Sequence, residues 1–425
     1  MTPATTHAQA MGASTELQRC PLMPSYGPPS VQFVRGQGSW LWDLQGKKYL
    51  DLLSGLAVTS LGHSHPAVSE ALCEQSQKLL HVSNLFGTEH SAPLAQTLDS
   101  LLGGGGQVFF ANSGAEANEA AIKLARKFGG PGRHVVLSAL GSFHGRTLAT
   151  LHATGQPAKH TAFQPLPEGF RHVEFCDIDQ LEAALDHTVA AVLLEAVQGE
   201  GGVNPVTVEY FQAVRRLCDE HGILFMVDEV QTGLGRCGSW FAFQQMQVQP
   251  DVVTMAKALG NGVPIGACWA RVDVAAAFQP GDHATTFGGQ PLAAAAARSV
   301  LRVMQEEDVP LLAQVAGAQF AQQLQVLPAV TQVRGLGLLL AVELDQDVLG
   351  EAAATRAAAL LLDQGVVVNA VTPTAIRLAP SLLISEDEIQ QAVSALSAVF
   401  ADLQVEHEQK AEHEQKAQHG QKATS

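Results

Sequence analysis

Four short motifs in the chain contain residue types that carry chemistry, and the first of them is centred on Lys257. This lysine follows the apolar run at residues 252–255 and precedes a glycine-rich turn. A lysine at the end of a buried strand loses solvation, which lowers the pKa of its amine and makes it a better nucleophile. An isolated lysine is usually a surface residue, but such residues do not typically lie between an apolar strand and a glycine-rich turn. Lys257 is therefore a candidate nucleophilic amine.

The second motif places Asp228 at the end of another apolar run, residues 223–227. Ligands of parallel sheets bind outside the carboxyl ends of the strands. A carboxylate at this place can keep a pyridine nitrogen protonated, which makes the ring an electron sink. A helix cap or an ion pair is the more common role of an isolated aspartate, so this interpretation depends on the neighbouring motifs.

The third and fourth motifs also follow predicted strands. Residues 112–118 (NSGAEAN) open a helix with small side chains, and backbone N–H groups at the positive end of a helix dipole bind phosphate. An ordinary turn with a helix cap would have the same pattern. Residues 142–147 (SFHGRT) contain Phe143, which can stack on a planar ligand, and Arg146, which can bind a carboxylate through two hydrogen bonds.

The elements that must position these motifs are short apolar strands alternating with helices. Five runs bounded by Gly, Pro, Ser or Asn are predicted as buried strands: residues 107–111, 134–139, 190–197, 223–228 and 252–255. The helix after the first strand is predicted to have four apolar residues on one face: Ala117, Ala121, Leu124 and Phe128. A second helix spans residues 208–221 and ends at Gly222. This alternation predicts an α/β fold with a mostly parallel sheet covered on both faces.

The pattern changes from about residue 330, which predicts a smaller α+β domain. Residues 333–344, 366–371 and 375–378 are predicted as strands and residues 352–363 as a helix. A last helix begins at Ser385, and Glu388 three residues later completes a capping box. Residues 406–422 repeat EHEQKA with period six and have no apolar face, so we expect a solvated or frayed tail there.

These patterns divide the chain into five expected parts. They are a loosely ordered arm (residues 1–30), a segment joining the small domain (31–65), a large ligand-binding domain (66–310), the small α+β domain (311–405) and a low-complexity tail (406–425).

Composition excludes several classes of protein. Of the 425 residues, 46% are hydrophobic and 16% are charged, which is typical of a globular chain with a large core. The net charge of −16 argues against nucleic acid or anionic lipid as a partner. Six cysteines without a CxxC motif favour reduced thiols in the cytoplasm, and we expect no metal site. We expect neither a signal peptide nor a membrane span.

In combination the motifs resemble the class III, or ornithine-type, aminotransferases, from about Tyr26 to Leu403. The matching stretches, in order, are LDLLSGLAVTSLGHSHP, FFANSGAEANEAAIKLAR, SFHGRT, EAVQGEGG, VDEVQTGLGRCG, MAKALGNGVPIGA and TTFGG. The resemblance implies the fold type I architecture of pyridoxal-5'-phosphate-dependent transferases, with a mostly parallel seven-stranded sheet in the large domain and a small α+β domain. It also implies a homodimer with each active site at the subunit interface.

The resemblance implies a role for each matching residue around the cofactor. Lys257 is identified with the lysine that holds the cofactor as a Schiff base and moves the proton between substrate and cofactor, and Asp228 with the partner of the ring nitrogen. Gln231 is expected to contact the ring hydroxyl, and Val230 and Phe143 the two ring faces. The cofactor phosphate is expected to be bound by Ser113, Gly114 and Ala115, and by Thr286 from the other subunit. Glu229 and Arg236 are expected to be structural.

Within the family the chain is most similar to the acetylornithine aminotransferases, which implies four substrate-binding residues. Arg146 would bind the α-carboxylate of acetylornithine, and Arg377 that of glutamate or 2-oxoglutarate. Glu200 would pair with Arg377 when the ω-amino substrate is bound and release it for glutamate. Thr285 stands at a substrate-contacting position where serine is expected. The implied function is ping-pong transfer of the δ-amino group of N-acetyl-L-ornithine to 2-oxoglutarate in arginine biosynthesis.

Other functions remain open at the level of sequence. Ornithine, 4-aminobutyrate or a carrier-protein-bound semialdehyde of lysine biosynthesis would use the same chemistry. Gly55 stands where ornithine aminotransferases are expected to have a pocket tyrosine, which favours a longer, acylated substrate. A carrier protein is usually acidic, and the net charge of −16 would repel it. An aminomutase and a cofactor-binding protein without turnover are the remaining alternatives.

Overall fold

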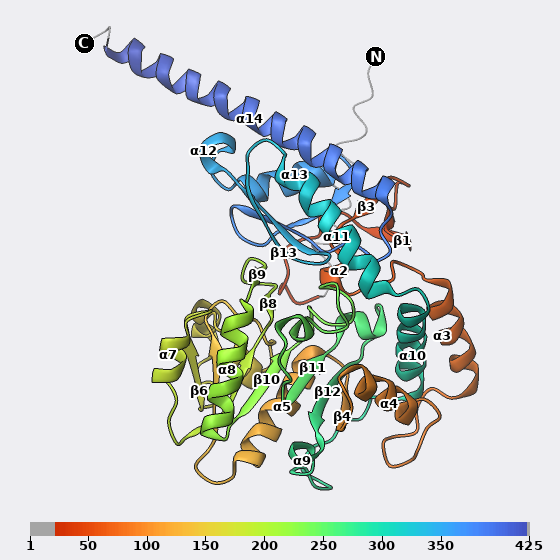
Figure 1. Cartoon of the computed structure of the whole chain (residues 1–425). Coiled ribbons are helices and arrows are strands. Elements are labelled where there is room, and N and C mark those ends of the chain that lie inside the picture. Colours follow the sequence, from red (N-terminus) through yellow and green to blue (C-terminus); the bar gives the residue numbers. More distant parts are fainter. Residues whose placement is uncertain (1–21, 423–425) are drawn as a thin grey trace.

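A seven-stranded sheet forms the centre of the larger part of the molecule (Figure 1). The structure is a computed structural model that describes residues 22–422, so most of the expected arm lies outside the described residues. The strand order is β4-β12-β11-β10-β7-β5-β6, and β12 is antiparallel to both of its neighbours. The strands are β4 (Gly106–Ala111), β5 (Val135–Ala139), β6 (Phe170–Val173), β7 (Val189–Leu194), β10 (Leu224–Asp228), β11 (Val252–Met255) and β12 (Gly266–Arg271). The mostly parallel seven-stranded sheet is confirmed.

The sequence predicted five of these strands and missed two. β6 (FRHV) contains two polar residues, and β12 (GACWAR) begins with glycine and small residues, so neither shows the apolar run that predicted the others. One predicted strand was too long, because β7 ends at Leu194. The following residues form β8 (Val197–Gln198), which pairs with β9 (Asn204–Pro205) outside the main sheet.

Alternate residues of the central strands face opposite sides of the sheet, and each side is covered by helices. In β10, Leu224 and Met226 pack with α5 (Gly114–Gly129), whereas Phe225 and Val227 pack with α8 (Val208–His221). α8 matches its predicted bounds, and Gly222 ends it in the left-handed conformation. The predicted apolar face of α5 is right for Ala117, Ala121 and Leu124 but wrong for Phe128, which is exposed near the end of the helix.

Shorter helices complete the frame of the larger part. They are α2 (Ser54–Ala57), α3 (Pro66–Lys78), α4 (Ser91–Leu101), α6 (Leu148–Ala153), α7 (Ile178–Ala183) and α9 (Val272–Ala275), with 3-10 turns η1 (Pro157–Lys159), η2 (Thr161–Phe163), η3 (Ala242–Met246) and η4 (Lys257–Gly260). The long helix α10 (Pro291–Glu306) packs on α3, and α11 (Val309–Gln325) packs on strands of the other part of the molecule. None of the helices within residues 22–422 combines the length and hydropathy needed to cross a bilayer.

Two four-stranded sheets form the other part of the molecule. One has the order β1-β2-β3-β15 and joins the N-terminal strands to a C-terminal one, and the other has the order β13-β14-β17-β16. The elements are β1 (Phe33–Gln37), β2 (Trp40–Asp43), β3 (Lys48–Asp51), β13 (Val330–Leu336), β14 (Leu339–Leu344), α12 (Gln346–Leu349), α13 (Ala353–Asp363), β15 (Val366–Val367), β16 (Asn369–Ala370) and β17 (Ala375–Leu378). The boundaries proposed above for the domains stay a prediction.

Two strand predictions in this part were wrong. Residues 333–344 form a hairpin of β13 and β14, which turns at Gly337 with φ +55°. A Cβ atom there would lie 2.5 Å from the carbonyl carbon of Cys237, so the turn packs directly on the loop after β10. Residues 366–371 are also two strands, β15 and β16, which belong to different sheets. Helix α13 and strand β17 agree with the sequence.

The C-terminal helix α14 (Glu386–Lys422) is longer than expected and projects beyond the rest of the molecule at the upper left of Figure 1. The predicted capping box is present, with hydrogen bonds between Ser385 and Glu388 in both directions. We expected a solvated or frayed tail: the helix runs through the EHEQKA repeat, so the tail is not frayed, but the side chains of residues 408–413 are exposed to solvent. Glu, Gln, Lys and Ala favour helix, and pairs four residues apart, such as Glu406 with Lys410, add to its stability.

Arg236 links the parts of the molecule, as its expected structural role requires. Its guanidinium is fully buried and donates to the carbonyl oxygens of Leu338 (3.0 Å) and Pro380 (2.6 Å) and to the hydroxyl of Ser60 (3.3 Å). These three acceptors lie in separate segments, so one side chain holds the loop after β10 against both the N-terminal and the C-terminal regions.

Candidate active site

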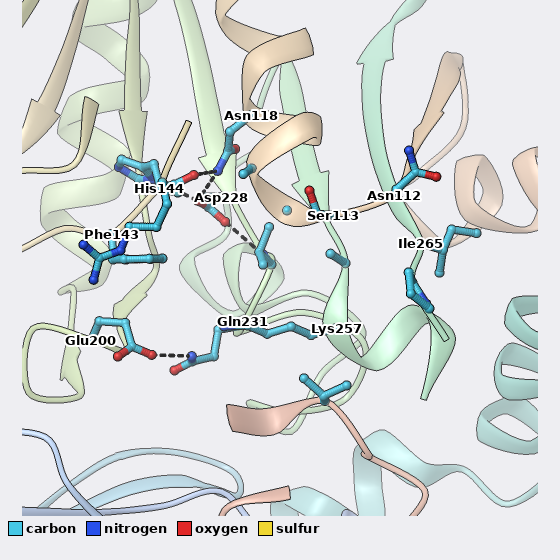
Figure 2. A pocket seen from close by; sticks show the side chains of 18 of the residues that line it. Asn112, Ser113, Asn118, Phe143, His144, Glu200, Asp228, Gln231, Lys257 and Ile265 are labelled. Atoms are coloured by element: carbon cyan, nitrogen blue, oxygen red, sulfur yellow. Dashed lines mark hydrogen bonds and ion pairs between the residues drawn. The ribbon is translucent and has the colours of Figure 1, made fainter. Parts of the chain in front are cut away.

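The four motifs meet in one cavity of about 380 Å³ at the carboxyl ends of the parallel strands (Figure 2). Asp228 ends β10, Lys257 follows β11, Ser113 follows β4, and Phe143 and Arg146 follow β5. Parallel strands end at the same edge of a sheet, which is why motifs far apart in sequence converge there. The volume is of the size that small-molecule sites usually have.

Lys257 lies on the cavity wall, half-buried, at the start of the turn η4. Its backbone has φ +41°, an unusual value for a side-chain-bearing residue and one common at functional sites. Burial lowers the pKa of its amine and the charge of Arg377 lowers it further, while the charges of Glu200 and Asp228 raise it. The lowered pKa favours the neutral, nucleophilic amine that was predicted from the sequence.

Asp228 is buried at the end of β10 and is held by three donors. Its Oδ2 atom accepts hydrogen bonds from Asn118 Nδ2 (2.7 Å) and lies 2.8 Å from His144 Nδ1, and its Oδ1 atom accepts from the backbone N–H of Val230 (3.0 Å). An ionised carboxylate only accepts, so the His144 Nδ1 atom carries the proton. Figure 2 shows Asn118 and His144 converging on Asp228.

The first turn of α5 forms another part of the cavity wall. Ser113 is the N-cap, and its hydroxyl accepts a hydrogen bond from the backbone N–H of Glu116 (3.2 Å). The N–H groups of Gly114 and Ala115 lie in the first turn, where a helix has no internal acceptor for them. A Cβ atom on Gly114 would lie 2.6 Å from Val230 Cγ1, so glycine is needed for the turn to approach that side chain.

Phe143 lies on the cavity wall, and a buried carboxyl, that of Glu195, fixes its backbone. Glu195 follows β7 directly and accepts a hydrogen bond from the Phe143 N–H (3.1 Å). Burial raises the pKa of Glu195 well above its ordinary value, and the charge of Asp228 raises it further. Both causes favour the protonated form of this carboxyl.

A second ionic group connects the cavity with the C-terminal sheet. Glu200 Oε1 lies 2.6 Å from Nη1 of Arg377, which is buried in β17, and it also accepts from Gln231 Nε2 (3.2 Å). Burial raises the pKa of Glu200, but the charge and hydrogen bond of Arg377 outweigh it, so the pKa lies below its ordinary value. The Nη2 atom of Arg377 is buried and has no partner within the described residues, so this guanidinium can still donate to a ligand.

The structure brings most of the predicted site residues together, but not all. Residues of all four motifs line the cavity, as do Glu200, Val230 and Gln231, and Arg377 contacts it through Glu200. Thr285, Thr286 and Gly55 do not line it. Thr285 Oγ1 accepts from Asn112 Nδ2 (3.3 Å), Thr286 is exposed, and Gly55 is exposed in α2.

Sequence reasoning missed three residues of the site: Asn118, His144 and Glu195. Asn118 and His144 lie inside motifs that were recognised, but their contact with Asp228 spans 110 and 84 residues of sequence. Glu195 had a usable signal, because it is an acid that directly follows an apolar strand, as Asp228 does.

The cavity fits a planar, phosphorylated pyridine cofactor on three observations. The first turn of α5 offers unpaired N–H groups to a phosphate, Asp228 offers a buried carboxylate to a ring nitrogen, and Phe143 and Val230 offer apolar surfaces to a ring. A metal centre is not indicated, since no group of three or more His, Cys, Asp or Glu side chains in the described chain is arranged to hold an ion.

Comparisons with known proteins agree with this geometry. The family profile described as aminotransferase class III matches residues 23–400. Acetylornithine aminotransferases from Corynebacterium efficiens and Gloeobacter violaceus are 50% and 47% identical to the chain. Each alignment covers 90% of this chain, and the two cover 95% and 96% of the relatives' own lengths. An ornithine aminotransferase structure from Toxoplasma gondii (TM-score 0.87, 32% identity) covers 96% of this chain and 100% of its own. An acetylornithine aminotransferase structure from Elizabethkingia anophelis (TM-score 0.80, 32% identity) covers 91% and 98%.

The network around Asp228 leads to the first prediction. Asp228→Asn replaces the carboxylate with a neutral amide, which cannot stabilise a positive charge on a ring nitrogen. We expect kcat to fall by about 100-fold or more, with the cofactor still bound. The matched control is Asp273→Asn, since Asp273 is exposed and paired with Arg271 away from the cavity. A loss of less than about tenfold in Asp228→Asn, or an equal loss in the control, would contradict this role.

Proposed function

The chain belongs to the class III aminotransferase family, and from that premise we propose that it transfers the δ-amino group of N-acetyl-L-ornithine to 2-oxoglutarate. The reaction proceeds in two half-reactions and serves arginine biosynthesis. The observation that carries this proposal is the Glu200–Arg377 pair beside Lys257, because it lets one cavity receive two differently charged amino donors. The curated relatives reported above are named for the same activity.

Pyridoxal 5'-phosphate, the cofactor of the family, supplies a ring that takes up electrons from the substrate carbon. Lys257 holds the cofactor and moves the proton at that carbon, a role that its lowered pKa supports. Asp228 keeps the proton on the ring nitrogen, and His144 and Asn118 keep Asp228 in position. The phosphate binds at Ser113, Gly114 and Ala115.

The remaining contacts orient the ring. Val230 and Phe143 would pack on its two faces, and Gln231 would donate to its hydroxyl. Glu195 holds Phe143 through the backbone, so it acts as a positioning residue. Contacts on both faces and one edge would hold the ring in a single orientation relative to Lys257.

Two arginines and one glutamate distinguish the two substrates. Acetylornithine presents its α-carboxylate to Arg146, with Thr285 beside it, while Glu200 stays paired with Arg377. Glutamate carries a second carboxylate at the reacting end. It takes Arg377, whose free Nη2 atom is available, and Glu200 withdraws. Because the ion pair opens only for glutamate, the buried Arg377 is not left unpaired when acetylornithine is bound.

We also propose that the active unit is a homodimer in which Thr286 reaches the phosphate of the partner subunit. An exposed apolar patch supports this: Leu79, Leu80, Leu85, Phe86 and Phe287 are 42–85% exposed. Asn84 joins the patch to the Thr286 segment through hydrogen bonds to the carbonyl oxygens of Thr285 and Gly288, both 3.1 Å. Exposed patches of this kind usually mark protein interfaces. Cytoplasmic location is proposed from the five free cysteines in the described residues.

The substrate is tested by comparing amino donors with 2-oxoglutarate as the acceptor. We expect N-acetyl-L-ornithine to have a higher kcat/KM than ornithine, 4-aminobutyrate or the carrier-linked amine that corresponds to the semialdehyde. Acylation removes a positive charge that would be costly to desolvate at an apolar wall. If the carrier-linked donor is preferred by more than about tenfold, the enzyme belongs to lysine biosynthesis instead. A preference for free ornithine would contradict the proposal that the enzyme selects an acylated donor.

The ion pair gives a second prediction. Glu200→Gln leaves Arg377 without a charged partner, so Arg377 is permanently free for a carboxylate. We expect the glutamate half-reaction to be unchanged or faster and the acetylornithine half-reaction to be slower, each measured by stopped-flow absorbance of the cofactor. Glu209→Gln, at the first turn of α8 and distant from the cavity lining, is the control. Equal damage to both half-reactions would argue against a switch.

A further inference from the structure

A cation without an assigned role lies beside the cavity at Lys159. It is the last residue of the turn η1, and its Nζ atom lies 5.3 Å from the centroid of the Phe143 ring. The guanidinium carbon of Arg146 lies 5.5 Å from the same centroid. Phe143 and Arg146 both line the cavity, whereas Lys159 lies outside the lining and adds a second positive charge next to the Phe143 ring.

Neither cation is paired with an anion in the part of the chain that the structure describes. Within residues 22–422, the side chains of Lys159 and Arg146 make no hydrogen bond or ion pair, and each lies over the Phe143 ring. The arginine on the other side of the cavity, Arg377, is by contrast paired with Glu200 at 2.6 Å. In a chain of net charge −16, two cations over the same ring that are not paired with an acid in the described residues indicate a place for an anion from outside.

The electrostatic balance at Lys159 supports the same conclusion. Burial lowers the pKa of its ammonium group, Arg146 lowers it further by repulsion, and Glu200 raises it. A carboxylate bound between the two cations would relieve that repulsion and favour the charged form of Lys159.

The turn that carries Lys159 is fixed to the loop that carries Arg146. The side-chain amide of Gln156 donates to the carbonyl oxygen of Ser142 (3.0 Å), and the backbone N–H of Gly155 donates to the Ser142 hydroxyl (2.9 Å). On the other side of Lys159, His160 Nε2 lies 2.7 Å from the carbonyl oxygen of Thr154. Because the backbone on both sides is held, little entropy is lost when a ligand binds between the two cations.

We propose that Lys159 is a second carboxylate-binding residue, which acts with Arg146 on the substrate carboxylate remote from the reacting amine. The inference rests on the proposed function, in which that group is the α-carboxylate of the acylated donor and the side-chain carboxylate of glutamate. Lys159 contributes to binding in both half-reactions, and it favours amines that carry a remote carboxylate over plain alkyl amines.

The test measures the glutamate half-reaction of the holoenzyme in both directions with Lys159→Met, which keeps the length of the side chain and removes its charge. We expect KM for glutamate and for 2-oxoglutarate to rise about fivefold, kcat to change by less than about twofold, and the cofactor absorbance to stay as in the wild type. Lys159→Arg should restore the KM values. Raising the salt concentration should reduce the difference between wild type and Lys159→Met, because salt screens partly exposed charges.

The matched control is Lys410→Met, which removes one positive charge from the exposed part of α14, where Lys410 pairs with Glu406. It should leave every constant unchanged. An unchanged KM in Lys159→Met would overturn the proposal. So would a fall in kcat with altered cofactor absorbance, since Lys159 would then position Phe143, and so would a loss that Lys159→Arg fails to restore. The glutamate half-reaction does not depend on which amine is the preferred donor, so a wrong donor assignment is distinguishable from failure at Lys159.

Discussion

The active-site cavity depends on how a buried carboxylate is paired inside the protein. Asp228 is 4% exposed, and an unpaired carboxylate in such a place would cost several kcal/mol of folding free energy. Hydrogen bonds from His144, Asn118 and Val230, none longer than 3.0 Å, offset that cost. Their donors lie in the loop after β5, in α5 and after β10, so satisfying one carboxylate also fixes three of the four motifs relative to one another.

Much of the fold was predictable because most strands of the main sheet are continuous apolar runs. The strands that lack such a run were missed. β10 and β11 are buried on both faces, and a continuous apolar run is the expected pattern for such strands. β12 has the same burial, but it is built from small residues that the pattern does not single out. The β13–β14 hairpin was missed because Gly337 turns the chain within what looks like one strand. The helix through the tail repeat depends on helix propensity and local charge pairs, which an argument from apolar faces does not consider.

The candidate site was predictable where chemistry and strand ends coincide, as at Lys257 and Asp228, and much less so where contacts span long stretches of sequence. Glu200 and Arg377 are 177 residues apart, and only the family resemblance connected them before the structure did. Lys159 belongs to no motif, and its significance depends on the distance to Phe143. The roles of Thr285 and Thr286 stay predictions, since neither lines the cavity of its own chain.

The account as a whole depends on Lys257 being the amine that holds the cofactor. The most direct measurement is to treat the holoenzyme with sodium borohydride, which fixes the cofactor to that amine, and to locate the added mass by peptide mass spectrometry. The account predicts that the added mass lies on Lys257 alone and that Lys257→Ala abolishes it while the protein stays folded. Labelling of Lys159 or any other lysine in the wild type, or undiminished labelling in Lys257→Ala, would contradict it.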